Sequence, residues 1–481
     1  MKNLLRIKVL LALVLSVLLL FTLSACGNHT DTANDDTAPD DLVTGEVDWD
    51  FYTERATSFL LAMAQGHFDE AYHMLDSVMA EALHDADIGL EDIWASNIAQ
   101  AGTFLSIYET DHLVQDGFYC ILITSEHEIS GLLSLVALTE DGLVGGLQNL
   151  GFPILEAEDA ESARFTEYPI VIGAGTDFPL DGMLSMPSDV TGQVPAAIIL
   201  GGSGIHNMDG LAAGLTNRIH RDIAEYLAEN GIAVIRYDRR LYAHTESALE
   251  TFGGSLTVRE EVIEDVLLAV ELLRTDPRID SDRIYLIGHS LGGMLAPRIH
   301  AEADFAGLIL MAATPRHMLE MGIEQLRASV STAIETGMLT EADLADLIVQ
   351  IDLLDDLFDQ LADIPDEKAQ ETPVPPFGAT AYYFKDMALH PFADYIQGLT
   401  VPILVMQGSR DFQILADVDF VLLQELFTGR SNVTFRLYTD LNHSFMPTTA
   451  ENFIEHAESV MLPGHVYIPA LQDIADWILG Q

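Results

Sequence analysis

Short apolar runs alternate with helical stretches over the last two thirds of the chain. Ala196-Ala-Ile-Ile-Leu200 is wholly apolar, as a strand covered on both faces of a parallel sheet requires. Helical spacing occupies the intervals, for example over Asn217–Glu229 and Val258–Arg274. This alternation predicts a doubly wound, mostly parallel α/β sheet over residues 160–481. The predicted strands are Phe165–Ile172, Gly182–Met186, Ala196–Leu200, Ala233–Tyr237, Arg283–Ile287, Gly307–Met311, Pro402–Gln407 and Val433–Tyr438.

A different order of elements precedes this region. Apolar residues at helical spacing predict a helix over Phe51–Ala64, and Gly66–Leu75 is typical of a turn that leads into a second helix. Strand-like runs follow, and Asp141-Gly142 favours a hairpin turn. Helices followed by an antiparallel meander predict a small α+β module over residues 48–156. Its predicted strands are Thr103–Tyr108, Gly117–Thr124 and Ile129–Thr139.

The interval between the sixth and seventh strands of the α/β region predicts a helical insertion over about residues 315–398. Large apolar side chains recur in it at helical spacing, on helices whose other face is rich in Asp. We expect this apolar stripe to form a cap over the functional site, with Ala381-Tyr-Tyr-Phe384 as aromatic walls. A packing helix remote from the site is the alternative. The stripe consists of Leu344, Leu347, Ile348, Ile351, Leu354, Leu357, Phe358 and Leu361.

Residues 1–25 have the pattern of a signal peptide. Lys2, Arg6 and Lys8 precede the apolar run Val9–Leu23. Leu23-Ser-Ala-Cys26 then resembles a bacterial lipobox, which implies a diacylglyceryl group on Cys26 and cleavage before it. Residues 26–47 are polar and acidic and predict a disordered tether. We therefore expect an extracytoplasmic protein anchored by lipid to a bacterial membrane; an ordinary secretory signal is the alternative.

Charge and cysteine content exclude several classes of protein. The chain carries 22 Lys+Arg against 75 Asp+Glu, a formal net charge of -53, which disfavours nucleic acid as a partner. Its two cysteines, Cys26 and Cys120, exclude a disulfide framework. The spacings of His67, His73 and His84 match no familiar metal site, so we expect neither a metal nor an organic cofactor. No feature of the sequence predicts a protein partner.

Gly288-His-Ser-Leu-Gly292 matches the G-x-S-x-G pattern of a nucleophile elbow. It lies between the predicted strand Arg283–Ile287 and a helix predicted over Met294–Ala303, which is the context that such an elbow needs. Bulk at Gly288 or Gly292 would collide with the flanking strand and helix. The motif predicts Ser290 as a nucleophile, and the helix that follows it favours a nearby anion.

A nucleophilic serine needs a base, and the base needs an acid that orients it. In this fold the chain order is Ser, then Asp or Glu, then His. Asp411 follows one predicted strand and His443 follows the next, which places both at the carboxyl edge of the sheet beside Ser290. Asp440 is an alternative acid. His456 and His465 are alternative bases, although neither follows a strand so directly.

An acyl-transfer site also needs two backbone N–H groups that bind the oxyanion. The first is predicted to be that of Leu291, directly after the nucleophile. The loop Gly201-Gly-Ser-Gly204 after an earlier strand should supply the second, and we expect it to be the N–H of Ser203. This loop lacks the Lys and the spacing of a phosphate-binding loop.

With these motifs the chain resembles bacterial esterases of the dienelactone-hydrolase and prolyl-oligopeptidase-like branch of the α/β hydrolases. Phe68-Asp-Glu-Ala71 resembles the N-terminal module of some of them. Relatives usually carry His-Gly-Ser-Gly-Pro where this chain has Gly201 and Ile205, and they tend to have Gly where it has Leu241. They also carry an acidic-basic-acidic run at Asn207-Met-Asp209. The shared motifs are Gly201–Gly210, Ile235–Arg240, Gly288–Gly293, Gly408–Asp411 and Leu441–His443.

The resemblance implies the α/β-hydrolase fold and hydrolysis of a small carboxylic ester through an acyl-enzyme. Ser290 would be the nucleophile, His443 the base and Asp411 its orienting acid. A serine peptidase and an acyltransferase of the same fold are alternative functions. A cell-surface binding protein with a vestigial hydrolase domain is a further alternative, although the complete Ser, Asp and His set argues against it.

Overall fold

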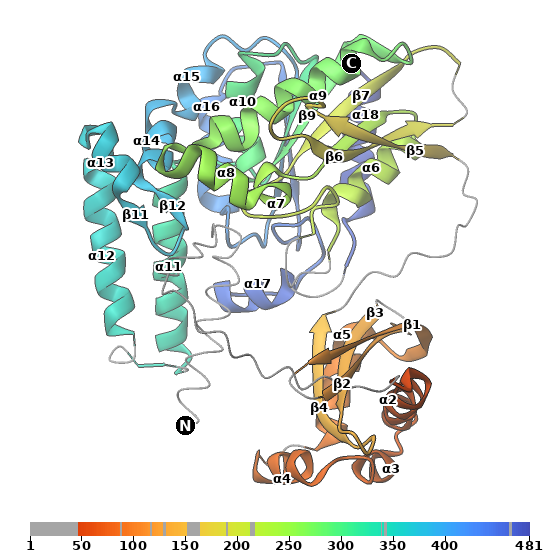
Figure 1. Ribbon diagram of the computed structural model, residues 1–481. Helices are drawn as coiled ribbons and strands as arrows, with labels where there is room; N and C mark the ends of the chain where they lie inside the picture. The colour runs from red at the N-terminus through yellow and green to blue at the C-terminus, as the bar shows by residue number, and fades with distance from the viewer. Residues whose placement is uncertain are drawn as a thin grey trace.

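The computed structural model (Figure 1) describes residues 47–86, 89–115, 118–127, 131–151, 164–188, 191–211, 217–337, 339–340, 344–460 and 464–481. The predicted signal peptide, Cys26 and nearly all of the predicted tether lie outside these residues. Within the described ranges, no helix combines the length and the apolar character that crossing a membrane requires.

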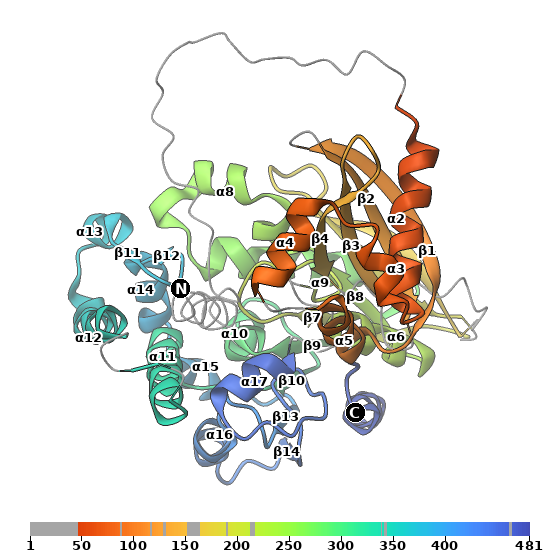
Figure 2. The same ribbon diagram turned by 90° about the horizontal axis from the view of Figure 1, so that it is seen from below.

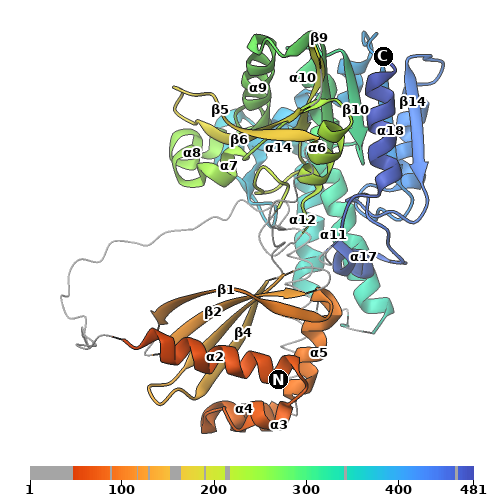
Figure 3. The same ribbon diagram turned by 90° about the vertical axis from the view of Figure 1, so that its right-hand side faces the viewer.

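The described N-terminal elements are helices followed by an antiparallel sheet. The helices are α2 (Trp49–Ala64), α3 (Phe68–Tyr72), α4 (Ser77–Ala86) and α5 (Leu90–Ala101). The strands are β1 (Phe104–Gln115), β2 (Phe118–His127), β3 (Gly131–Leu138) and β4 (Val144–Gly151), in the spatial order β1-β2-β3-β4. Helix α2 lies along this sheet (Figure 3), where Phe59 and Leu60 pack in one apolar core with Ile121 and Val136. The order of elements is the α+β order that the sequence predicts.

Strand β4 is not predicted by the sequence pattern. Its adjacent glycines Gly145 and Gly146 are poor strand formers because they offer no side chain to pack. In the structure a Cβ on Gly145 would lie 2.6 Å from Cε1 of Phe118. A larger residue at Gly145 would therefore have to displace the aromatic ring of Phe118, the first residue of β2.

The second sheet has eight strands among the described residues, in the order β14-β13-β10-β9-β7-β8-β6-β5. Strand β6 pairs antiparallel with both β5 and β8, and the other neighbours pair in parallel. This arrangement confirms the predicted, mostly parallel α/β architecture. The strands are β5 (Phe165–Ile172), β6 (Leu180–Pro187), β7 (Val194–Leu200), β8 (Ala233–Tyr237), β9 (Ile279–His289), β10 (Gly307–Met311), β13 (Ile403–Gly408) and β14 (Val433–Tyr438).

Helices cover both faces of this sheet (Figure 3). Along β7, Ala196 and Ile198 face the core formed with α9 and α10, whereas Ala197 and Ile199 face the core formed with α6 and α18. All seven residues of β7 are buried, as expected for a strand in the middle of a two-sided sheet. The covering helices are α6 (Ile219–Glu229), α9 (Glu264–Thr275), α10 (Leu291–His300) and α18 (Ile468–Leu479).

Shorter elements connect these layers. A π-helical turn over Arg259–Ile263 leads directly into α9. Another π-helical turn, Ala416–Phe420, precedes α16. The remaining helices outside the insertion are α7 (Arg240–Ala243), α8 (Thr245–Phe252), α16 (Val421–Leu426) and α17 (Phe453–Val460).

The segment between β10 and β13 is largely helical. Its helices α11 and α12 lie side by side, away from the sheet (Figures 1 and 2). Leu344, Ile351, Leu354 and Leu361 of the apolar stripe are buried there. The elements of the insertion are α11 (Met318–Glu335), α12 (Ala345–Gln360), α13 (Asp366–Glu371), β11 (Pro373–Val374), β12 (Ala379–Thr380), α14 (Ala381–Leu389) and α15 (Phe392–Ile396).

Candidate active site

Ser290 lies at a sharp turn between β9 and α10. Its φ of 55° and ψ of -117° are strained for a residue other than glycine. The Ser290 N–H donates to the carbonyl of Met311 at 2.9 Å, which anchors the turn to the neighbouring strand. Helix α10 begins at Leu291, immediately after the turn and three residues earlier than predicted.

The two glycines of the motif are required by backbone contacts. A Cβ on Gly288 would lie 2.4 Å from the carbonyl oxygen of Gly292. A Cβ on Gly292 would lie 2.3 Å from the carbonyl oxygen of Leu200, at the end of β7. Each of these backbone neighbours belongs to the turn or to the adjoining strand, so it cannot move aside without opening the turn itself.

Asp411 and His443 come together at the carboxyl edge of the sheet. His443 Nδ1 lies 2.7 Å from Oδ2 of Asp411, and both side chains are buried. Oδ1 of Asp411 accepts the backbone N–H groups of Gln413 at 2.8 Å and of Ile414 at 3.0 Å. Burial alone raises the pKa of Asp411, but His443 and these hydrogen bonds outweigh it and hold the pKa below its ordinary value. The carboxylate is therefore ionised and can hold His443 in the tautomer that carries a proton on Nδ1.

The alternative residues have other hydrogen-bond partners among the described residues. Asp440 is half exposed and pairs with Arg410, with 2.6 Å between Oδ1 and Nε. His465 is largely exposed and lies 3.1 Å from Asp222. His456 is buried, and its Nε2 is 3.3 Å from Nε2 of Gln413. Of the two aspartates, the structure brings Asp411 to the His443 imidazole.

One small cavity brings the predicted residues together. Ser290, His443, Gly202 and Ser203 all line a cavity of about 70 Å³. A Cβ on Gly202 would lie 3.1 Å from Cβ of Ser290, so the Gly-Gly-Ser-Gly loop touches the nucleophile turn. Among the described residues no hydrogen bond joins Oγ of Ser290 to His443; such bonds are often long in unliganded sites and tighten with substrate.

The two predicted oxyanion donors are both available. The N–H groups of Ser203 and Leu291 donate to no acceptor in the described part of the chain. Leu291 is the first residue of α10, where the unpaired N–H groups of a helix favour an anion. Both N–H groups are therefore left without an acceptor among the described residues, as the predicted oxyanion hole requires.

Three further histidines surround the cavity, and sequence reasoning did not single them out. His289 Nε2 lies 2.9 Å from the carbonyl oxygen of His443, while the rings of His206 and His220 pack over Gly201. Burial and the nearby His443 lower the pKa of His289 to about 3, and burial and Arg239 lower that of His206 to about 4. Burial and His206 also hold the pKa of His220 well below its ordinary value. All three are therefore neutral near pH 7. In the sequence, only the position of His289 within the G-x-S-x-G motif indicated a histidine beside the nucleophile.

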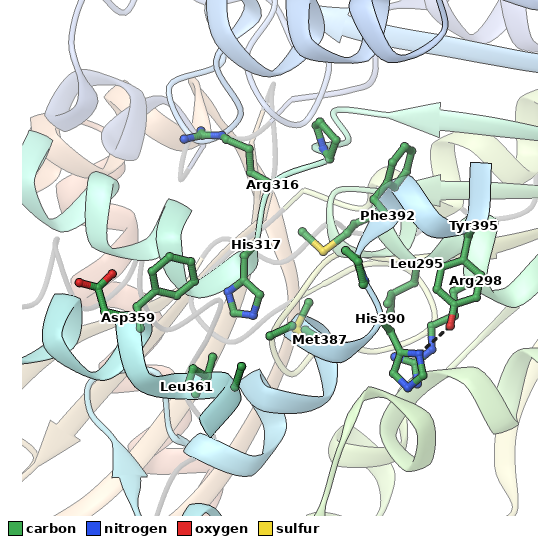
Figure 4. A pocket seen from close by; sticks show the side chains of 16 residues that line it. Leu295, Arg298, Arg316, His317, Asp359, Leu361, Met387, His390, Phe392 and Tyr395 are labelled. Atoms are coloured by element: carbon green, nitrogen blue, oxygen red, sulfur yellow. Dashed lines mark hydrogen bonds between the residues drawn. The ribbon is translucent and has the colours of Figure 1, made fainter. Parts of the chain in front are cut away.

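A larger cavity, of about 290 Å³, lies beside α10 (Figure 4). Phe358 and Leu361 of the apolar stripe line it, together with Met387 and Phe392. The stripe thus packs on α11 and around this second cavity, and no residue of the insertion lines the Ser290 cavity among the described residues. The predicted cap over the nucleophile stays a prediction: Phe358 and Leu361 of the stripe line the second cavity, whereas other residues of the insertion reach Ser203.

The insertion approaches the site through other residues. Tyr383 and Phe384, predicted as aromatic walls, line a cavity of about 20 Å³ together with Ser203.

Across the described ranges, no cluster of three or more His, Cys, Asp or Glu side chains is placed to hold a metal ion.

Comparison with known proteins gives one curated relative with broad coverage. Esterase EstD of Thermotoga maritima is 28% identical over 448 residues, which cover 91% of this chain and 98% of that protein. Among solved structures, Est1E from Butyrivibrio proteoclasticus matches 65% of this chain and 99% of its own, with 18% identity and a TM-score of 0.40. Dipeptidyl peptidase 4 of Porphyromonas gingivalis matches 77% of this chain and 43% of its own, with 13% identity and a TM-score of 0.42.

The family-level comparison covers just over half of the chain. The matched model is described as the alpha/beta hydrolase family, and it spans residues 205–456. This range contains the Ser290 turn, Asp411 and His443, together with most of the parallel sheet. The chain belongs to the alpha/beta hydrolase family.

Proposed function

We propose that this protein is a serine esterase that hydrolyses small carboxylic esters through Ser290, His443 and Asp411. One observation carries the proposal: His443, which is 2.7 Å from the buried Asp411, lines the same cavity as Ser290. An ionised acid, an oriented imidazole and a nucleophile that substrate can reach are the three parts that acyl transfer needs. The name of the relative that aligns with 91% of the chain, an esterase, supports the same reaction.

In the proposed mechanism, Oγ of Ser290 attacks the ester carbonyl carbon while Nε2 of His443 takes the hydroxyl proton. Asp411 stabilises the imidazolium that forms, without taking the proton itself. The carbonyl oxygen gains a negative charge and accepts the N–H groups of Ser203 and Leu291. Collapse of this intermediate breaks the ester bond, and His443 returns its proton to the departing alcohol.

Water then resolves the acyl-enzyme by the same route. His443 removes a proton from water, the hydroxide oxygen bonds to the acyl carbon, and Ser290 leaves with the proton that His443 returns. The small volume beside Ser290, about 70 Å³, favours short acyl groups. We therefore propose acetyl to butyryl esters as the preferred class.

The decisive experiment replaces the nucleophile. Ser290→Ala should lower ester hydrolysis by about 10³-fold or more and abolish labelling by a fluorophosphonate. Ser329→Ala is the control, because Ser329 is a buried serine that bonds to the carbonyl of Gln325 within α11 and does not line the Ser290 cavity. Labelling that persists in a folded Ser290→Ala protein contradicts the proposal.

A substrate panel separates the remaining functions. Acetyl to decanoyl esters, amides and peptides should be compared, each with and without an alcohol acceptor. An esterase releases free acid from the short esters. Faster turnover of peptides supports a peptidase, transfer of the acyl group to the added alcohol in preference to water supports an acyltransferase, and no turnover of any substrate supports a binding protein.

We also propose that Cys26 carries a lipid that anchors the protein outside the cytoplasm. The proposal depends on the Leu-Ser-Ala-Cys sequence after an apolar run, and Cys26 lies outside the described residues. Cys26→Ser should move the protein from the detergent phase to the aqueous phase in a Triton X-114 partition. Cys120→Ser is the matched control and should stay in the detergent phase, since Cys120 is buried in β2.

A further inference from the structure

Arg239 is a buried arginine directly behind the Gly-Gly-Ser-Gly loop. It lies between β8 and α7, and its side chain is 4% exposed. Its Nη1 donates to the carbonyl oxygen of Gly202, and its Nη2 donates to Oε1 of Glu261. The proposed reaction assigns no step to this guanidinium. It nevertheless binds the carbonyl of Gly202, in the loop that lies against Ser290.

The contact with Gly202 controls where the next N–H points. The Gly202 carbonyl and the Ser203 N–H belong to one peptide unit, which is trans. In a planar trans peptide these two groups point in opposite directions. Holding the carbonyl oxygen against Arg239 therefore turns the Ser203 N–H away from the arginine. A guanidinium bound to the carbonyl also polarises the peptide, which strengthens its N–H as a donor.

Glu261 joins this contact to the insertion. It lies in the π-helical turn Arg259–Ile263 and is buried. Oε2 of Glu261 accepts the hydroxyl proton of Tyr383 at 2.7 Å, so both carboxylate oxygens are in use. Tyr383 lies on α14, 122 residues further along the chain. Both residues, together with Ser203, line the 20 Å³ cavity beside the loop.

We propose that Arg239 is a positioning residue for the oxyanion hole, and that Glu261 and Tyr383 connect it to the helical insertion. The inference rests on the proposed esterase function. A buried ion pair adds little net stability, because losing hydration offsets the attraction between the charges. We infer instead that the Arg239–Glu261 pair sets the direction of the Ser203 N–H. Because Glu261 also binds Tyr383, that direction depends on the position of α14.

The main test removes both charges together, which avoids leaving one buried charge unpaired. Arg239→Met combined with Glu261→Gln should lower kcat by about 10- to 100-fold with KM changed less than about 2-fold. The affinity for a trifluoromethyl ketone should fall by the same factor as kcat/KM. This inhibitor adds to Oγ of Ser290, gives its carbonyl oxygen a negative charge and leaves the serine proton on His443. The matching secondary alcohol forms no oxyanion and should bind unchanged.

A neighbouring pair is the matched control. Arg240 is equally buried and pairs with Asp265 and Glu264 of α9, and among the described residues it makes no hydrogen bond to the loop. Arg240→Met combined with Asp265→Asn should change the melting temperature while leaving kcat and inhibitor affinity within about 2-fold of wild type. If this control loses as much rate as the Arg239 pair, positioning is not specific to Arg239 and the proposal is wrong.

Tyr383→Phe is a second, milder variant that tests the same inference if the Arg239/Glu261 variant does not fold. It removes one hydroxyl group and should lower kcat and inhibitor affinity together by about 3- to 10-fold. Unchanged kcat and inhibitor affinity in Tyr383→Phe, or in a folded Arg239/Glu261 variant, overturns the inference. Failure of the esterase proposal looks different, because the wild-type protein would then turn over no ester and Ser290 would not be labelled.

Discussion

The carboxyl edge of the large sheet and the insertion between β10 and β13 bury their side chains in opposite ways. At the sheet edge the buried groups are polar, and Asp411 and His443 are held by partners within 3.0 Å. In the insertion the stripe on α12 is apolar and packs on α11 without directional bonds. A hydrogen bond depends on distance and angle but adds little net stability, whereas the burial of apolar side chains adds stability and has no preferred direction. Substitution of Asp411 at the edge should therefore change the rate more than the stability, and substitution of a buried leucine of the stripe should change the stability.

The largest expected effect is at the acid of the sheet edge. Asp411→Asn should lower kcat by about 10³- to 10⁴-fold, because an amide favours the wrong imidazole tautomer. The melting temperature should stay close to that of wild type. Asp440→Asn is the matched control, since Asp440 is exposed on the same edge and pairs with Arg410. Equal losses of kcat in the two variants would show that Asp411 has no special role.

The second effect is on the stability of the insertion. Leu354 is 4% exposed, whereas its neighbour Leu353 is 62% exposed. Leu354→Asp should lower the free energy of unfolding by about 3–5 kcal/mol, because a carboxylate replaces a buried leucine. Leu353→Asp should change it by less than about 0.5 kcal/mol. Urea denaturation measures both variants.

The same pair of variants tests whether the stripe also acts on the reaction. In protein that remains folded, kcat/KM for an acetyl ester should equal that of wild type for both variants. A changed acyl-length profile in Leu354→Asp, with a wild-type profile in Leu353→Asp, would support the prediction that α12 bounds the substrate.

A glycine from each region gives the third effect. Gly292→Ala places a Cβ 2.3 Å from the carbonyl oxygen of Leu200, so it should destabilise the protein by about 1–3 kcal/mol and reduce fluorophosphonate labelling. Gly398, at the end of the insertion, has open space around its Cβ position and a backbone that any residue adopts. Gly398→Ala should be neutral or stabilise by up to about 1 kcal/mol. Thermal unfolding measures the stability of both variants. Equal destabilisation by Gly292→Ala and Gly398→Ala would contradict the steric argument.

The smallest effect is a pH dependence of stability that arises at the sheet edge. His206 has a folded pKa of about 4, below its ordinary value of 6.5. The unfolded chain therefore binds the proton first, so stability is present above pH 6.5 and is lost as the pH falls toward 4. Between pH 7 and 5 this histidine should cost about 1–2 kcal/mol. His206→Gln should unfold with a smaller difference between the two pH values; an identical difference would mean that His206 is not buried in its neutral form.

The polar edge was more predictable from the sequence than the apolar insertion. Ser290, Asp411 and His443 each follow a strand of the parallel part of the sheet, and the carboxyl ends of parallel strands meet at one edge. Strand position therefore indicated which side chains would gather. The stripe on α12 carries no such information, because apolar periodicity predicts a buried face without saying which surface covers it.

The sequence by itself determined the alternation of strands and helices, the strained turn at Ser290 with its two glycines, and the family to which the chain belongs. These features are local, since they depend on spacing of two to four residues and on the size of individual side chains. The tertiary structure decided that Asp411 and not Asp440 faces His443, that α12 packs on α11, and that neutral histidines surround the cavity. It alone brought Arg239, Glu261 and Tyr383 together, because these contacts join residues 22 and 122 positions apart, which no local pattern can relate.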